Sequence, residues 1–304
     1  MSRARPAGVL QIAIPSLLIV AVGAGCMAPE ERLDVSYDDR FGDATLMDLY
    51  LPDGDAPANP TVLFIHGGSW TGGSKKHFVA AGRRLARSGF VVASANYRLV
   101  PDGVFPNNIE DCICSLAYLR AHAADYRIDP DRILVMGYSA GAHLASLVGL
   151  ASEHPELQPD CEAAAGAAVA PPAAVISASG PQDMRTFWDE VGDKSGVEGI
   201  FGGSPDELPR MYDLGSPRFH VRPGVPPFLL LEDALDFGGV EAMRAALVDD
   251  GNDARLLKIA GSLHILEQAA DPGVYEGGVS SETPEAWIAI DDFLFRTIAR
   301  TEAP

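Results

Sequence analysis

Two short glycine-rich motifs contain the residues best suited to chemistry in this chain. One is Gly137-Tyr138-Ser139-Ala140-Gly141, which has the G-x-S-x-G form of a nucleophile elbow, a sharp turn that joins a strand to a helix. An apolar run at residues 132–136 precedes the turn, and residues 142–148 follow it with helical spacing. Glycines flank Ser139 because a side chain there would collide with the tight backbone. This context predicts that Ser139 is a nucleophile.

The second motif, His66-Gly67-Gly68-Ser69-Trp70, follows a predicted strand at residues 61–65. Attack of a serine on a carbonyl group creates an oxyanion, which needs hydrogen-bond donors that are already aimed at it. We expect the backbone N–H groups of Gly67, Gly68 and Ala140 to be those donors. Taken alone, His-Gly-Gly suits a plain turn at a strand end equally well. Its pairing with the elbow favours an oxyanion hole.

With both motifs in place, the chain resembles the alpha/beta-hydrolase carboxylesterases of the hormone-sensitive-lipase-like and feruloyl-esterase-like branch. The resemblance extends over residues 34–300 and depends on further segments that occur in family order. They are Asp48-Leu49-Tyr50-Leu51-Pro52, Tyr97-Arg98-Leu99-Val100-Pro101, Phe105-Pro106, Ile109-Glu110-Asp111, Ile128-Asp129-Pro130-Asp131-Arg132-Ile133 and Ala142-His143-Leu144. The resemblance implies an alpha/beta-hydrolase fold and a serine hydrolase that cleaves carboxylic esters.

The resemblance also implies where the other members of a Ser–acid–His triad lie. His264 ends the segment Ala260-Gly261-Ser262-Leu263-His264, which matches the Gly-x-x-His loop of the family. Asp236 matches the family's acid and follows the predicted strand at residues 227–231. We therefore expect His264 to be the general base and Asp236 to orient it.

The predicted acid loop departs from the family at two positions. Glu232 and Asp233 stand where the family usually has His-Gly, so three carboxylates are candidates to orient one imidazole. Asp233 is the alternative acid after Asp236. The two additional acids also suit a solvated loop on an acidic surface.

The rest of the chain contains the elements that such a site needs. Predicted strands alternate with predicted helices, which favours a mostly parallel central sheet with helices on both faces. An antiparallel hairpin is expected at the sheet edge, and about 280 residues suffice for one large α/β domain. The expected hairpin strands are residues 33–37 and 45–51, the other strands 61–65, 90–95, 132–137, 173–177, 227–232 and 254–259, and the helices 77–88, 107–123, 139–151, 240–250 and 284–299.

Residues 183–224 form the longest stretch without a clear element, with aromatic residues among many glycines and prolines. By the resemblance, this segment is a short cap-like insertion that walls the substrate pocket within the single domain at residues 34–300. A surface loop that covers the sheet edge is the alternative.

Composition argues against several other functions. The formal net charge is −19 at pH 7, and no basic stripe offsets it, so binding to nucleic acid or anionic phospholipid is disfavoured. The histidines are scattered, and His66 and His143 fall where the family has structural histidines. No Cys/His set has metal-ligand spacing, and no dinucleotide or Walker motif is present. We expect no cofactor and no metal, and a small-molecule ester as the binding partner.

Two alternatives to an ester hydrolase remain open. An arylformamidase-like amide hydrolase would use the same fold and triad on a different bond. A non-catalytic ligand-binding protein would have lost part of the triad, whereas Ser139, Asp236 and His264 are all present. The expected substrates are small acyl or aryl esters, including acetyl or feruloyl groups on carbohydrate. The motifs do not identify the natural acyl and alcohol groups or the oligomeric state.

The N-terminus resembles an export signal. A short basic region precedes an apolar segment at residues 9–22, and small residues lead to Cys26, as in a secretory signal peptide. Small residues directly before a cysteine resemble a bacterial lipobox, although Gly23 replaces the usual leucine. We expect residues 1–25 to be removed, Cys26 to be lipid-modified, and residues 26–33 to tether an exported domain to a membrane. Ordinary secretion and an uncleaved anchor are the alternatives.

The other cysteines bear on the compartment. Cys112 and Cys114 are two apart on a predicted helix, so they point in different directions and cannot readily bridge each other. Cys161 lies in a polar loop after the elbow helix. A bridge from it to Cys112 or Cys114 would fit an oxidising compartment. Three unpaired, partly buried thiols are the alternative.

Overall fold

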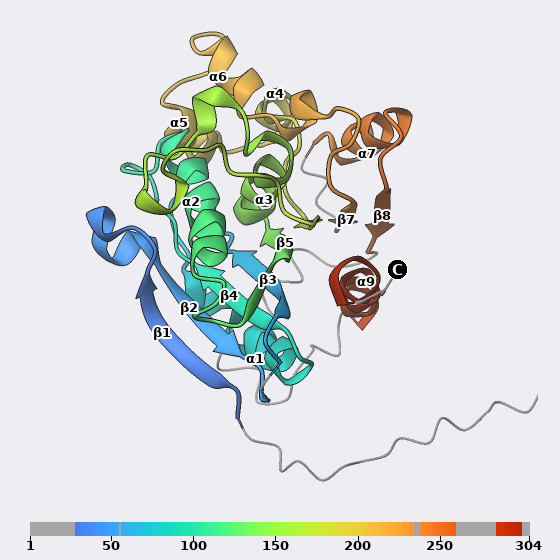
Figure 1. Ribbon diagram of the computed structural model, residues 1–304. Helices are drawn as coiled ribbons and strands as arrows, with labels where there is room; N and C mark the ends of the chain where they lie inside the picture. The colour runs from blue at the N-terminus through green and yellow to red at the C-terminus, as the bar shows by residue number, and fades with distance from the viewer. Residues whose placement is uncertain (1–27, 55, 234–237, 260–283, 300–304) are drawn as a thin grey trace, which may run out of the picture.

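A single sheet forms the centre of the molecule in the computed structural model, which describes residues 28–54, 56–233, 238–259 and 284–299 (Figure 1). Within these residues the strand order is β1-β2-β4-β3-β5-β6-β7-β8. Pairing is antiparallel from β1 to β2 and from β2 to β4, and parallel between all other neighbours. The mostly parallel sheet and its antiparallel edge hairpin are confirmed. The strands are β1 (Glu30–Ser36), β2 (Leu46–Leu51), β3 (Asn59–Ile65), β4 (Val91–Ala95), β5 (Ile128–Tyr138), β6 (Ala174–Ala178), β7 (Phe228–Glu232) and β8 (Ala254–Lys258).

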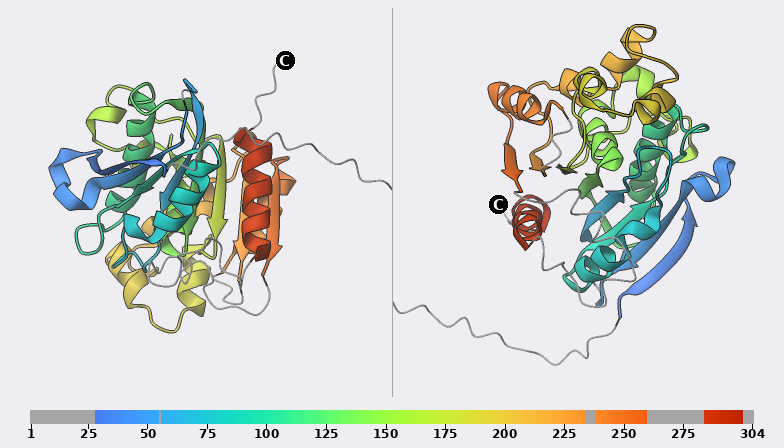
Figure 2. Two further views of the ribbon diagram at one scale, coloured as in Figure 1. Left: turned by 90° about the horizontal axis from the view of Figure 1, so that it is seen from below. Right: turned by 180° about the vertical axis from the view of Figure 1, so that it is seen from behind.

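Helices cover both faces of the sheet, as the alternation of elements predicted (Figures 1 and 2). One face is covered by α2 (Asn107–Ala121), α3 (Ala140–Ala151) and α7 (Val240–Asp249), and the other by α1 (Val79–Arg87) and α9 (Pro284–Leu294). In β3, Leu63 and Ile65 belong to the core of the first face, and Val62 and Phe64 to the core of the second. This division follows from the alternation of side chains along a strand. It explains why the predicted strands are continuous apolar runs.

Short helices occupy the segment between β6 and β7, where no element was predicted. They are α4 (Met184–Glu190), α5 (Ser195–Phe201), α6 (Pro209–Leu214) and the turn η5 (Pro217–His220). None exceeds seven residues, which is too short for an apolar periodicity to be visible in the sequence. Phe187, Ile200 and Tyr212 from these helices join the same core as α2 and α3, so the segment packs on that face of the domain.

Further helical turns complete the described structure. They are η1 (Asp39–Thr45), η2 (Lys75–Phe78), η3 (Pro155–Leu157), η4 (Glu162–Ala164) and η6 (Phe295–Ala299). No helix in the described ranges has both the length and the apolar character that a membrane crossing requires. Cys26 and the predicted signal segment at residues 1–25 lie outside the described residues.

A disulfide joins Cys114 in α2 to Cys161 at the start of η4. The sequence left Cys112 and Cys114 as possible partners of Cys161. In the structure Cys161 is bonded to Cys114, and Cys112 is a buried free thiol. The alternative of three unpaired thiols is wrong. Cys161 is also buried and does not lie in an open polar loop, because the bridge draws it against α2.

Candidate active site

Ser139 occupies the turn between β5 and α3, where the G-x-S-x-G motif predicted it. Its backbone has φ 54° and ψ −122°, a conformation that costs a non-glycine residue about 1–3 kcal/mol. The Ser139 N–H donates a hydrogen bond of 2.9 Å to Ala178 O at the end of β6, which holds the turn against the neighbouring strand. Ser139 is partly exposed, whereas Tyr138 and Ala140 beside it are buried. A strained, accessible serine at a strand–helix turn is typical of a nucleophile elbow.

The glycines on both sides of Ser139 make this turn possible. A Cβ at Gly137 would lie 1.9 Å from Gly141 O, and a Cβ at Gly141 would lie 2.1 Å from Ile65 O. Both obstructing atoms belong to the backbone, which cannot move aside as the end of a flexible side chain can. The expected collision is therefore confirmed.

The end of β3 brings the second motif beside the elbow. β3 and β5 are parallel neighbours with Ile65 opposite Gly137, so the chain leaves both strands at the same edge of the sheet. A Cβ built on Gly67 would lie 2.9 Å from Tyr138 O and 3.1 Å from Ser139 Cβ. The backbone of Gly67 therefore passes beside Ser139 at a distance that favours glycine.

Hydrogen bonds fix the backbone conformation of the segment His66–Trp70, which we call the glycine loop. His66 Nδ1 donates a 2.8 Å bond to Gly67 O, and the Tyr97 hydroxyl donates a 3.0 Å bond to His66 O. Gly68, with φ +119°, accepts at its carbonyl from two backbone N–H groups further along the chain. These bonds fix the peptide planes around Gly67. Tyr97 belongs to a segment that supported the resemblance, but nothing local in the sequence indicated this contact.

Two buried histidines near the site serve a structural purpose. The His66 ring stacks on Tyr97 with 4.4 Å between ring centroids, and His143 Nε2 donates a 2.7 Å bond to Gly215 O. Burial lowers the pKa of each imidazole to about 4, so both are neutral at pH 7. Both neutral rings donate to backbone carbonyls, which is a structural role of the kind that the resemblance implied. Among the residues that the structure describes, no three histidine, cysteine or acidic side chains are arranged to hold a metal ion.

The helices between β6 and β7 pack against the glycine loop. A Cβ at Gly196 of α5 would lie 3.7 Å from Ser69 Cβ. The Trp70 ring meets His143 edge to face at 5.5 Å between centroids, and Phe187 of α4 at 6.2 Å. Trp70 therefore lies between the elbow helix and α4, a role that sequence reasoning did not assign to it.

The predicted acid and base lie outside the described residues. Asp236 falls within residues 234–237, and His264 falls within residues 260–283. The described ends of β7 and β8 reach the same sheet edge as Ser139, because β5, β6, β7 and β8 are adjacent and parallel. Ligands of open α/β sheets bind at this carboxyl edge. Asp236 and His264 stay predictions.

The acidic residues at the end of β7 are buried. Glu232 and Asp233 are 4% and 6% exposed, so the alternative of a solvated loop is wrong at these two positions. Glu232 Oε2 lies 3.1 Å from Lys258 Nζ, and the two residues face each other across the β7–β8 pair. Lys258 also pairs with Glu241 of α7. Glu232 therefore links two strands through an ion pair.

A mostly parallel sheet with a strained serine after β5 and a glycine loop after β3 defines an alpha/beta-hydrolase. The chain belongs to the BD-FAE family, whose model matches residues 47–237. This span contains both glycine-rich motifs. The resemblance to alpha/beta-hydrolase esterases is confirmed.

Individual relatives carry ester-hydrolase names. The chain is 39% identical over 136 residues to "Probable carboxylic ester hydrolase LipM" of Mycobacterium tuberculosis, covering 43% of this chain and 31% of LipM. It is 30% identical over 219 residues to "Esterase LipQ" of the same organism, covering 69% of this chain and 51% of LipQ. The matches thus span about a third to a half of the length of these relatives.

One solved structure, "Truncated form of carbohydrate esterase from gut microbiota", superposes with a TM-score of 0.76 at 22% identity. The match covers 91% of this chain and 99% of that one. It supports the alpha/beta-hydrolase fold over nearly the whole chain.

Proposed function

We propose that this protein hydrolyses carboxylic esters with Ser139 as the nucleophile. The observation that carries the proposal is the strained backbone of Ser139, with φ 54° and ψ −122°, at a strand–helix turn, because backbone strain of this kind clusters at active sites. The passage of Gly67 beside Ser139 supports it. Membership of the family over residues 47–237 and the names of the relatives support it further.

In the proposed reaction, Ser139 Oγ attacks the ester carbonyl carbon while His264 takes the hydroxyl proton. The carbonyl oxygen becomes an oxyanion, which the N–H groups of Gly67, Gly68 and Ala140 stabilise. The tetrahedral intermediate then expels the alcohol, which receives the proton from His264, and the acyl group remains on Ser139. Water activated by His264 attacks this acyl-enzyme and releases the carboxylic acid.

Asp236 is proposed to orient the His264 imidazole, with Asp233 as the alternative. Glu232 is disfavoured because its carboxylate already pairs with Lys258. We expect Asp236→Asn to lower kcat by about 10⁴, the effect of removing the acid from a serine triad, and Glu232→Gln to lower it far less. A loss concentrated in Asp233→Asn would assign the acid to that residue instead.

The decisive experiment is a burst assay with p-nitrophenyl acetate. The wild-type protein should release a burst of p-nitrophenol as the acyl-enzyme forms, and Ser139→Ala should abolish it and lower turnover by about 10⁶. Ser179→Ala is the matched control, because Ser179 also has φ 54° and lies just after the neighbouring strand β6. It should keep most of the activity. Near-wild-type turnover in Ser139→Ala, or equal losses in both variants, would refute the assignment.

The proposed substrates are small acyl or aryl esters, including acetyl or feruloyl groups on carbohydrate. The relatives' names support an ester bond over an amide. A panel that crosses acyl length with sugar, aryl and formamide leaving groups tests this through kcat/KM. Preference for an aryl formamide would move the function to amide hydrolysis, and binding without turnover would indicate a ligand-binding protein.

The protein is further proposed to be exported and held at a membrane by a lipid on Cys26. The N-terminal sequence supports export. The Cys114–Cys161 disulfide supports an oxidising compartment.

A further inference from the structure

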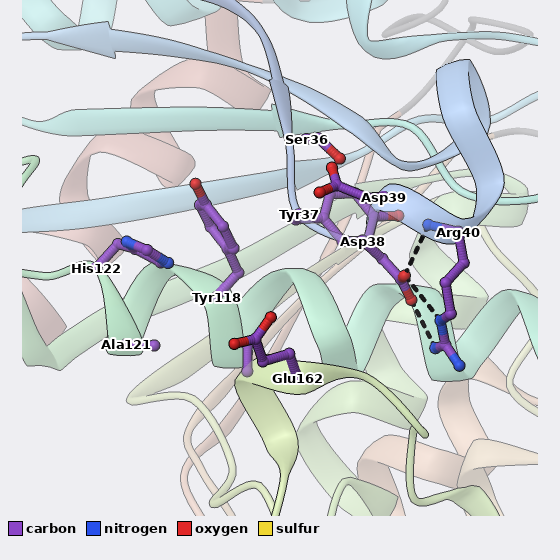
Figure 3. Close-up of a pocket in the computed structure, with 10 residues that line it drawn as sticks. Ser36, Tyr37, Asp38, Asp39, Arg40, Tyr118, Ala121, His122 and Glu162 are labelled. Atoms are coloured by element: carbon purple, nitrogen blue, oxygen red, sulfur yellow. Dashed lines mark hydrogen bonds and ion pairs between the residues drawn. The ribbon is translucent and has the colours of Figure 1, made fainter.

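A cavity of about 500 Å³ lies between η1, the last turns of α2 and the start of η4 (Figure 3). Its volume is within the range of about 300–1,000 Å³ that small-molecule sites have. No residue of the elbow or of the glycine loop lines it. We propose that this cavity, which we call the α2 pocket, binds a neutral, hydroxyl-rich carbohydrate.

Tyr118 forms the aromatic wall of the α2 pocket. In Figure 3 its ring stands between His122 and the loop that carries Asp38 and Asp39. His122 stacks on the tyrosine ring with 4.2 Å between centroids and is itself bonded to Asp125 at 2.9 Å. The ring is thus braced from one side and presents its other side to the pocket. A braced, flat apolar surface suits the C–H face of a sugar ring.

Hydrogen-bonding groups form the opposite wall. Arg40 donates from Nε and Nη2 to the two carboxylate oxygens of Asp38, at 2.9 and 2.7 Å, and these bonds hold the pKa of Asp38 below its usual value. Asp39 of the same loop and Glu162 of η4 are exposed and also line the pocket. Ionised carboxylates only accept hydrogen bonds, so a ligand must bring hydrogen-bond donors on one side and an apolar face on the other. A pyranose ring has this arrangement.

The charge of the lining narrows the class of ligand. Asp38, Asp39 and Glu162 against Arg40 are three negative groups and one positive group, a net charge of −2 from these four side chains. This charge repels carboxylated, sulfated or phosphorylated ligands. The same charge attracts cations, but quaternary ammonium groups are bound by cages of several aromatic rings, whereas Tyr118 supplies a single flat wall here. A neutral polyol fits best.

Covalent and ionic links hold the walls of the pocket together. The Cys114–Cys161 disulfide joins α2, one turn before Tyr118, to the start of η4. Arg40 Nη1 lies 3.2 Å from Asp160, which links η1 to the same segment. Walls that are positioned before the ligand arrives reduce the entropic cost of binding.

The test is calorimetric titration of the full chain carrying Ser139→Ala with neutral β-1,4-linked tetrasaccharides of xylose, glucose and mannose. At least one should bind, and adding Tyr118→Ala should weaken its binding about tenfold or more. Tyr118→Phe keeps the ring and should stay within about threefold of the unaltered pocket. The control is Phe219→Ala, since Phe219 is an exposed aromatic side chain elsewhere, at 48% exposure. It should leave binding unchanged.

Three results would overturn the proposal. They are no binding of any neutral tetrasaccharide at millimolar concentration, unchanged affinity in Tyr118→Ala, and tighter binding of choline or spermidine than of sugar. Hydrolysis of p-nitrophenyl acetate by Tyr118→Ala with Ser139 intact should match that of the wild type, and its loss would contradict a separate pocket. The inference does not depend on ester hydrolysis, so a wild-type protein without esterase activity would leave the titration decisive.

Discussion

Gly67→Ala tests the proposed oxyanion hole with one added methyl group. On the present backbone the new Cβ would lie 2.9 Å from Tyr138 O and 3.1 Å from Ser139 Cβ, so the glycine loop and the elbow must separate by a few tenths of an ångström. Gly67 is not among the residues with positive φ, so alanine adds no backbone strain there. The substitution should therefore displace the Gly67 N–H, a proposed oxyanion donor, from Ser139.

The size of the expected effect follows from the tolerance of the donor geometry. Donors act within about 2.7–3.1 Å of the oxyanion, and loss of one typically lowers kcat by about 10²–10³. A shift of a few tenths of an ångström moves the donors out of this distance range. The kcat for p-nitrophenyl acetate should therefore fall by about the same factor, with little change in KM. Overpacking costs about 1–3 kcal/mol, which lowers Tm by a few degrees in a domain of this size.

Gly196→Ala is the matched control, because Gly196 also touches the glycine loop. Its Cβ would lie 3.7 Å from Ser69 Cβ, an ordinary contact, and alanine is favoured over glycine in α5 by about 1 kcal/mol. This variant should keep wild-type kcat and gain a little thermal stability. A folded Gly67→Ala enzyme with kcat within about threefold of wild type would refute the role of Gly67. Equal losses in the two variants would trace the effect to the contact with α5.

Three further predictions concern stability and location. Cys161→Ser should lower the free energy of unfolding by about 4 kcal/mol in urea titration, because the disulfide joins residues 47 apart. Without this substitution, the unfolded, non-reduced and lipidated protein should show one free thiol, that of Cys112. His66 and His143 have pKa values near 4 when folded and about 6.5 when unfolded, so stability should fall as pH decreases from about 6.5 to 4, and His143→Asn should show a shallower fall. Cys26→Ser should release the protein from the membrane fraction or leave its precursor uncleaved. An unchanged membrane fraction and mature mass would contradict lipidation.

Much of the candidate site could be predicted from residues that are contiguous in the sequence. The elbow was predicted from an apolar run, G-x-S-x-G and a helical spacing, because strand and helix periods and turn chemistry depend on neighbours in the chain. The same reasoning predicted the parallel sheet and its edge hairpin. It did not detect α4, α5 and α6, whose lengths of six or seven residues give no periodic signal. Their stability comes from side chains that pack into the core shared with α2 and α3.

Contacts between distant residues depended on the tertiary structure. Which of Cys112 and Cys114 meets Cys161 is decided by the side of α2 that faces η4, and two positions in one helix cannot reveal that orientation. From the sequence alone, the acidic residues at the end of β7 suit a solvated loop. In the structure, the β7–β8 register instead buries Glu232 against Lys258. The sequence by itself determined where the chain forms a strand, a tight turn and a helix around Ser139, since those are local preferences. Burial, pairing and the walls of the α2 pocket were decided only by packing, because each requires segments that the chain order keeps far apart.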